Sequence, residues 1–222
     1  MDFMKLFKSL EELLYEVIVM LVFFPKTLWL TVRYPQRMMD YADTELGDVL
    51  SEQYKDTLSP PLFLMICVAL SYMVEQASPR PPDISALPTI LRDSQNLLAF
   101  RVLVFSLFPL AFSLRLLKGL GQPLDRDTLR APFFAQCFVA APVAMIVGIA
   151  QAMRNVPIAH ADLISTALLV FAIGWYMRQQ AWWLRTKLAL PMWRSWAATL
   201  GMTLVTVIVF FCLALAIMAF NR

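Results

Sequence analysis

The chain has 222 residues, of which 59% are hydrophobic and 16% charged, and its formal net charge at pH 7 is +3. Its mean hydropathy of +0.63 lies far above the usual range for a soluble domain, so the composition excludes that class. The long apolar runs also lack the alternation of apolar and polar residues that is typical of barrel strands. We therefore expect an all-α integral membrane protein.

Residues 3–24 predict an amphipathic helix at the cytoplasmic surface of the membrane. In its first half, Lys and Glu side chains fall at helical spacing on one face and apolar side chains cover the other. The apolar run Leu13–Phe24 is shorter than the roughly 20 residues that a crossing needs. The pattern predicts an interfacial helix that ends at Pro25, with a second break at Pro35.

An acidic linker follows at residues 37–61. Its acidic side chains, several of them three or four residues apart, are Asp40, Asp43, Glu45, Asp48, Glu52 and Asp56. One hypothesis is that this acidic stripe docks a basic partner or the basic loops of the chain itself, or captures a divalent ion weakly. The alternative is a solvated helix face that stays away from anionic lipid. Sequence alone leaves both interpretations open.

Five later stretches are long and apolar enough to cross a membrane as helices. Their ranges are about 60–77, 96–117, 132–153, 162–181 and 196–220. We therefore expect two regions. Residues 1–59 form a cytoplasmic and interfacial region, and residues 60–222 form a five-helix transmembrane bundle.

The distribution of basic residues predicts the orientation of this bundle. Most Lys and Arg residues fall in the N-terminal region and in the loops after the second and fourth spans. The opposite side would carry only Arg80, Arg92, Arg154 and Arg222. By the positive-inside rule, the N-terminus lies in the cytoplasm and the C-terminus outside.

The third span carries a stripe of small residues, which favours close helix packing in a membrane. A small residue recurs at every fourth position, as Ala140, Ala144, Gly148 and Ala152. This face could pack within the bundle or form a dimer contact. The sequence favours packing within the bundle, because a five-helix bundle buries such a face internally.

Glu75 and Arg101 are the charged residues placed nearest the apolar parts of the first and second spans. A charge in this position needs a partner, an interface or a function. Because consecutive spans are expected to be neighbours, we predict an ion pair between the two side chains near the outer interface. The alternative is that these two charges bind a substrate or a proton.

No motif of a known catalytic site occurs in the sequence. The single histidine, His160, precedes Asp162 in a short outer loop, where we expect Asp162 to cap the fourth span. The three cysteines lie in apolar runs without metal-ligand spacing. We therefore expect no enzyme activity, no cofactor and no metal site.

The order of these elements resembles the Yip family of small five-span membrane proteins, including the bacterial permease-like members. The resemblance lies in the segment VFFPKTLWLTVRYPQRMM, in the linker ending DTLSPPLFLM, and in five closely spaced spans after a cytoplasmic N-terminus. It implies a scaffold or accessory role, since eukaryotic members resemble adaptors that bind small GTPases.

We accordingly expect a non-enzymatic scaffold or accessory subunit of the bacterial inner membrane. Its expected partners are membrane lipids and proteins, within a homo-oligomer or a larger complex, and not nucleic acid. The alternative is a small permease or transporter subunit that acts as an oligomer.

Overall fold

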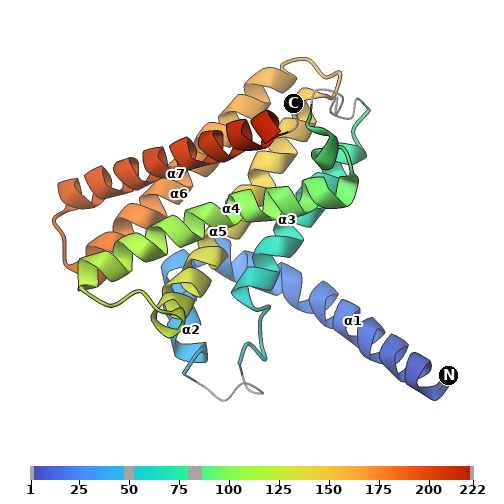
Figure 1. Cartoon of the computed structure of the whole chain (residues 1–222), viewed down its shortest axis with the longest axis horizontal. Coiled ribbons are helices and arrows are strands. Elements are labelled where there is room, and N and C mark those ends of the chain that lie inside the picture. The colour runs from blue at the N-terminus through green and yellow to red at the C-terminus, as the bar shows by residue number, and fades with distance from the viewer. Residues whose placement is uncertain (1–2, 48–52, 80–86, 221–222) are drawn as a thin grey trace.

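The computed structural model describes residues 3–47, 53–79 and 87–220, and the regular secondary structure over these residues is entirely helical. It contains seven α-helices and one short 3-10 helix (Figure 1). The α-helices are α1 (Phe3–Arg33), α2 (Pro35–Glu45), α3 (Pro60–Gln76), α4 (Ser94–Leu120), α5 (Arg126–Arg154), α6 (Ala161–Leu188) and α7 (Met192–Phe220). The 3-10 helix η1 (Thr89–Leu91) precedes α4. The expected all-α fold is thus confirmed for the described residues.

Five of these helices, α1, α4, α5, α6 and α7, are long and apolar enough to cross a membrane. This length and composition indicate a multi-pass membrane protein. Four of them contain the expected spans 96–117, 132–153, 162–181 and 196–220. The fifth is α1, whereas the expected span 60–77 corresponds to the 17-residue helix α3.

The prediction that the first helix ends at Pro25 is wrong, because α1 continues through this residue to Arg33. Proline removes one backbone hydrogen bond, but membrane helices tolerate it where neighbouring helices or Ser and Thr side chains satisfy the freed backbone groups. A side-chain hydrogen bond also stabilises the turn of α1 next to Pro25, because the Thr27 hydroxyl donates to the Phe23 carbonyl oxygen at 2.8 Å. The second predicted break is confirmed: Tyr34 leaves the helical conformation and Pro35 begins α2.

Helix α5 forms the centre of the bundle, with α3, α4, α6 and α2 packed around it. The small-residue stripe of Ala140, Ala144, Gly148 and Ala152 is buried within the chain. At Gly148, an added Cβ atom would overlap the side chain of Ser71 on α3. This face therefore allows α3 and α5 to approach closely.

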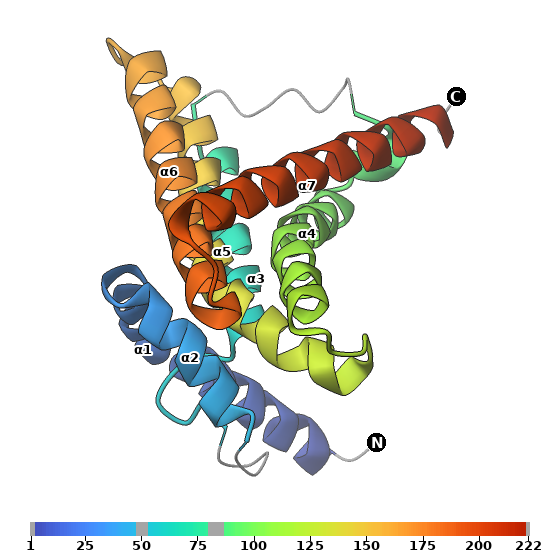
Figure 2. The same cartoon turned by 90° about the vertical axis from the view of Figure 1, so that its left-hand side faces the viewer.

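Helix α1 has few neighbours over its N-terminal part. Only 6% of its apolar window is buried, the same share as in α7 and far below the 61% of α5. Figure 1 shows α1 extending away from the bundle at a steep angle to α3 and α5. Figure 2 shows α1 and α2 together at one end of the molecule, beside the other helices.

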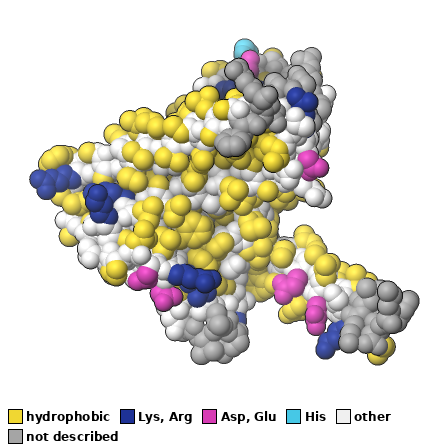
Figure 3. All heavy atoms as spheres, in the orientation of Figure 1, with side chains coloured by type: hydrophobic (Ala, Val, Ile, Leu, Met, Phe, Trp, Pro, Cys, Tyr) yellow, Lys and Arg dark blue, Asp and Glu magenta, His cyan; other side chains and the backbone are white. Residues whose placement is uncertain are grey.

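The face seen in Figure 3 has apolar side chains across its middle, and most of its coloured Lys, Arg, Asp and Glu side chains lie toward the margins. The exposed apolar side chains include Leu103, Leu163, Val170 and Leu204. An exposed apolar belt of this extent is expected for a surface that faces lipid tails.

Candidate functional site

Helix α2 lies against the C-terminal end of α6 through a charged contact. The ammonium group of Lys187 is 2.9 Å from Asp40 Oδ1 and 3.0 Å from Asp43 Oδ2. The two aspartates are three residues apart, so they lie on one face of α2. A single lysine in the last turn of α6 therefore binds two members of the acidic stripe.

A second polar contact joins the start of α2 to α6. The side-chain amide of Gln36 donates to the backbone oxygen of Gln179 at 3.0 Å and to its side-chain Oε1 at 3.1 Å. Between the two polar contacts, Met38, Met39 and Ala42 of α2 are buried. We call this arrangement of α2 on α5 and α6, with the contacts of Gln36 and Lys187, the α2 dock.

The end of the acidic linker folds back onto α2. The backbone N–H of Tyr54 donates to Glu45 Oε2 at 2.5 Å, and its hydroxyl donates to the Ala42 carbonyl oxygen at 3.4 Å. Tyr54 has a φ of 55°, a left-handed conformation that non-glycine residues seldom adopt. Burial and the Glu45 carboxylate raise the pKa of Tyr54 well above 10.0, and burial also raises the pKa of Tyr41. The side chains of Tyr41 and Tyr54 are therefore uncharged phenols at neutral pH.

The linker also contacts α1. The backbone N–H of Leu58 donates to the Thr27 hydroxyl at 3.1 Å, and Lys26 lies 3.9 Å from Asp56. The second contact is long and exposed to solvent, so it contributes little to stability. Helix α1 is thus joined to the bundle at its C-terminal third, next to the α2 dock.

The acidic residues predicted from the sequence therefore contact several places on the chain itself. Asp40 and Asp43 contact Lys187, Glu45 binds the Tyr54 backbone, and Asp56 lies near Lys26. The other two, Asp48 and Glu52, lie outside the described residues. In the described part of the chain, no group of three His, Cys, Asp or Glu side chains is arranged to hold a metal ion.

The sequence did not identify three residues of the α2 dock as specific contact residues. These are Gln36, Gln179 and Lys187. The sequence carries only weak indications of their contacts. Both glutamines stand at the ends of apolar segments, where a polar amide needs a partner, and Lys187 was one of many basic residues in its loop. Their pairing spans more than 140 positions and has no local pattern.

Two glutamines form a fully buried pair within the bundle. Gln136 of α5 donates to Gln180 Oε1 at 3.0 Å, and Gln180 of α6 donates back to Gln136 Oε1 at 2.5 Å. Both side chains are 0% exposed. Each amide meets a donor and an acceptor of its partner, so the pair fixes the register of α5 against α6.

Glu75 and Arg101 are brought together by α3 and α4 as an ion pair. Glu75 is buried, and the Arg101 guanidinium also lies over the Tyr72 ring, 5.0 Å from its centroid. The pair lines a cavity of about 490 Å³ between α3, α4 and α5. Gln151 and Arg154 of α5 line the same cavity, so it holds more positive than negative groups.

The loop before α6 does not match one detail of the expectation. Helix α6 begins after His160, whose φ of 67° is left-handed, and no side chain caps the helix. The prediction that Asp162 caps this helix is therefore wrong. Asp162 lies within the first turn, where a carboxylate still interacts favourably with the helix dipole.

No family model, curated protein or solved structure matches the chain. Function is therefore inferred from the contacts and cavities of the molecule itself. Its most distinctive features are the α2 dock and the exposed apolar helix α1 that leads into it.

Proposed function

We propose that this protein is a non-enzymatic scaffold or accessory subunit that holds partner proteins and lipids at the cytoplasmic face of a bacterial inner membrane. The observation that carries the proposal is the exposed length of α1: only 6% of its apolar window is buried, the same share as in α7, but α1 has the lower hydropathy of the two and carries exposed charges in its first half. An apolar surface of this length must be covered by lipid or by another protein. The α2 dock joins its C-terminal end to the bundle.

In this proposal, α1 lies along the cytoplasmic interface and does not cross the membrane. Its first half carries exposed charges, including Lys8, Glu11, Glu12 and Glu16, which suit headgroup level better than the bilayer interior. Its steep angle to α3 and α5 also supports this placement (Figure 1). The N-terminus is then cytoplasmic and the C-terminus outside, as the positive-inside rule predicts.

Helix α3 would then be the first crossing. Its 17 residues span about 26 Å at roughly 1.5 Å per residue, slightly less than the hydrocarbon thickness of about 30 Å. Such a short helix is acceptable here because Phe63, Leu64 and Cys67 are enclosed by other helices of the bundle. Five crossings are then α3, α4, α5, α6 and α7.

The proposed partners are membrane lipids and a second protein or a further copy of this chain. The resemblance of the α1–α2 segment and the linker to the Yip family stays a prediction, and its implied adaptor role is consistent with an exposed α1. The proposal involves no cofactor and no nucleic acid.

Photo-crosslinking in intact cells tests the scaffold function. A photoreactive amino acid is placed at Tyr15 or Leu21 of α1, which are 66% and 70% exposed. The matched control is Val170 of α6, which is 66% exposed in the apolar belt. We expect discrete protein adducts from the α1 positions and mainly lipid adducts from Val170. Lipid adducts alone from all three positions would contradict the proposal.

The cavity beside Glu75 and Arg101 favours a second candidate function, a permease subunit that acts as an oligomer. The Glu75–Arg101 pair and Arg154 line a cavity of about 490 Å³, and the surplus of positive charge in this lining suits an anionic solute. Liposomes that contain the purified protein test this function with a panel of labelled solutes and ions. Substrate-dependent flux that is lost in Arg101→Gln would replace the scaffold proposal.

A further inference from the structure

A second, larger cavity lies between α4 and the beginning of α5. We propose that it binds one anionic glycerophospholipid, with the lipid phosphate on Arg126 and Arg130 and an acyl chain along the leucines of α4. The inference deepens the lipid-binding part of the proposed function, but it rests only on this cavity and on the presence of a bilayer.

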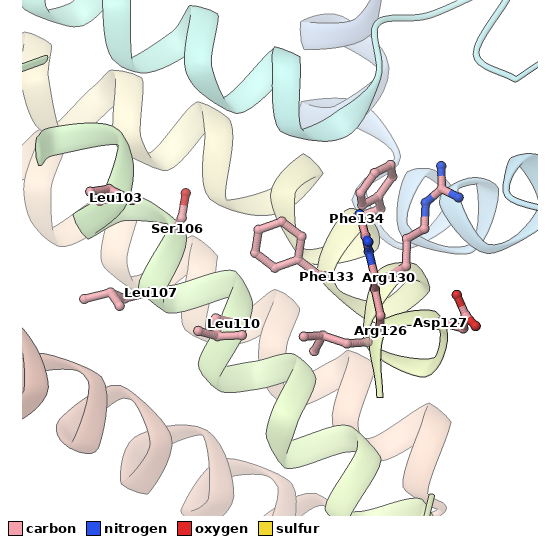
Figure 4. A pocket seen from close by; sticks show the side chains of 10 residues that line it. Leu103, Ser106, Leu107, Leu110, Arg126, Asp127, Arg130, Phe133 and Phe134 are labelled. Carbon is pink, nitrogen blue, oxygen red and sulfur yellow. The ribbon is translucent and has the colours of Figure 1, made fainter. Parts of the chain in front are cut away.

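The cavity has a volume of about 920 Å³ and two unlike ends. Leu103, Leu107 and Leu110 form one wall on α4, and Phe133 of α5 points toward them (Figure 4). From Leu103 to Leu110, this wall extends about 10 Å along the helix axis. The size lies within the range of about 300–1,000 Å³ that is usual for small-molecule sites.

The apolar wall offers little to a polar ligand. The hydroxyl of Ser106 lines the cavity but already donates to the Val102 carbonyl oxygen at 2.8 Å. In a bilayer, an apolar cavity on the outside of two helices is filled by lipid chains. The polar end therefore decides which lipid binds best.

That polar end carries two arginines, one turn apart at the start of α5. Over the described ranges, no carboxylate lies within ion-pair distance of Arg126 or Arg130. The Arg130 guanidinium lies over the Phe134 ring, 5.4 Å from its centroid, which limits its movement. Both guanidinium groups are exposed and available for a ligand.

The two nearby carboxylates do not neutralise this end. Asp125 caps α5, because its Oδ1 accepts the backbone N–H groups of Asp127 and Thr128 at 3.0 and 2.8 Å. Asp127 also lines the cavity, and Figure 4 shows its carboxylate on the same side of α5 as the Arg130 guanidinium. Two arginines and one carboxylate thus line this end of the cavity, which leaves it with a surplus of positive charge.

Arginine suits a phosphate group because its planar N–H donors bind two oxygens at once. A free phosphate ion would use the arginines but not the apolar wall, whereas a zwitterionic lipid would use the wall with less gain from the charges. An anionic phospholipid uses both ends of the cavity. We therefore assign the site to the lipid.

Native mass spectrometry of the purified full chain, titrated with phosphatidylglycerol or with phosphatidylcholine of identical acyl chains, tests this assignment. We expect tighter binding of phosphatidylglycerol. In the double variant Arg126→Gln/Arg130→Gln, its affinity should fall about 10-fold or more, because each arginine near the headgroup contributes on the order of 1 kcal/mol. Arg194→Gln is the matched control, since this exposed arginine lies outside the cavity.

A second variant tests the apolar wall. Leu107→Trp should fill the cavity and weaken binding of both lipids, while the two arginines stay in place. The melting temperature of each variant in detergent shows whether it remains folded. If the arginine double variant does not fold, Arg130→Lys replaces it, and we expect a partial loss of affinity because lysine lacks the planar set of donors.

Three results would overturn the assignment. They are equal binding of the two lipids by the unchanged protein, equal effects of the arginine double variant and the Arg194→Gln control, or displacement of the lipid by millimolar inorganic phosphate. Each of these leaves the scaffold function standing, because that function is measured by protein adducts from α1. Conversely, absence of α1 adducts would not affect lipid binding between α4 and α5.

Discussion

The ammonium group of Lys187 on α6 forms ion pairs with two carboxylates of α2. We therefore expect it to stabilise the packing of α2 against α6. Its side chain is 29% exposed, whereas those of Asp40 and Asp43 are 64% and 39% exposed. Solvent screens such partly exposed pairs, which limits each to about 0.5–1 kcal/mol. The contact is therefore better suited to a reversible attachment than to global stability.

We predict that Lys187→Met loosens α2 without unfolding the bundle. The two aspartates would lose their shared cation and repel each other across one helix face. Thiol labelling of Met39→Cys measures the effect, because Met39 is 0% exposed in the α2 dock. We expect faster labelling in the Lys187→Met background and an unchanged rate with Arg194→Met. Equal rates in both backgrounds would show that Gln36 and the buried methionines suffice.

The Gln136–Gln180 pair is also a contact between single side chains, but it lies in the buried interior of the bundle. Both amides are fully buried, so removal of one leaves the other without partners at a cost of about 1–3 kcal/mol. We predict that Gln180→Leu destabilises the protein by about this amount. The double variant Gln136→Leu/Gln180→Leu should recover most of the loss, because two apolar side chains then meet.

Reversible unfolding in mixed detergent micelles gives the four free energies of this double-mutant cycle. A coupling energy near zero would mean that the two amides act independently. The control is Gln179→Leu, a neighbour on α6 whose side chain accepts a hydrogen bond from Gln36 of α2. It should alter the α2 dock more than the free energy of unfolding of the bundle.

At the scale of elements, the contact between α3 and α5 depends on the absence of a side chain at Gly148. A Cβ atom at this position would overlap the Ser71 side chain. Both helices are packed on several sides by the bundle, so neither can move aside easily. Overpacking of this kind usually costs about 1–3 kcal/mol.

We predict that Gly148→Ala lowers the free energy of unfolding by about 2 kcal/mol, and that adding Ser71→Gly restores most of it. Gly201→Ala on α7 is the matched control, because a Cβ atom there meets nothing within 4 Å. That change should be neutral or slightly stabilising, since alanine favours helices over glycine. Equal losses at both glycines would indicate a general effect of helix composition instead of close packing.

At the scale of the whole molecule, the parts that could be predicted from the sequence depend on local composition. Four spans, the break at Pro35 and the small-residue stripe each reflect the residues of one segment. The continuation of α1 through Pro25 depends on its surroundings and could not be read from the proline alone. The pairing of Lys187 with Asp40 and Asp43 depends on how α2 folds back over α6, which no local pattern records.

The placement of α1 also decides the topology of the whole chain. An interfacial α1 with α3 as the first crossing puts the N-terminal residues and the α2 dock on one side of the membrane. If α1 crossed the membrane instead, Lys8 would lie on the side opposite Lys187. The same helices therefore allow two arrangements, which differ in the side of the membrane on which the N-terminal end of α1, including Lys8, lies.

We predict that a cysteine at Lys8 and a cysteine at Thr186 both lie on the cytoplasmic side. Each is introduced singly after replacement of Cys67, Cys137 and Cys212 by alanine or serine, and melting temperature checks the fold. Intact cells receive a membrane-impermeant maleimide, and permeabilised cells receive the same reagent. We expect labelling at both positions only after permeabilisation, and labelling of an outer-loop cysteine at His160 in intact cells. Labelling of the Lys8 position in intact cells would make α1 a crossing helix, because its charged end would then lie outside.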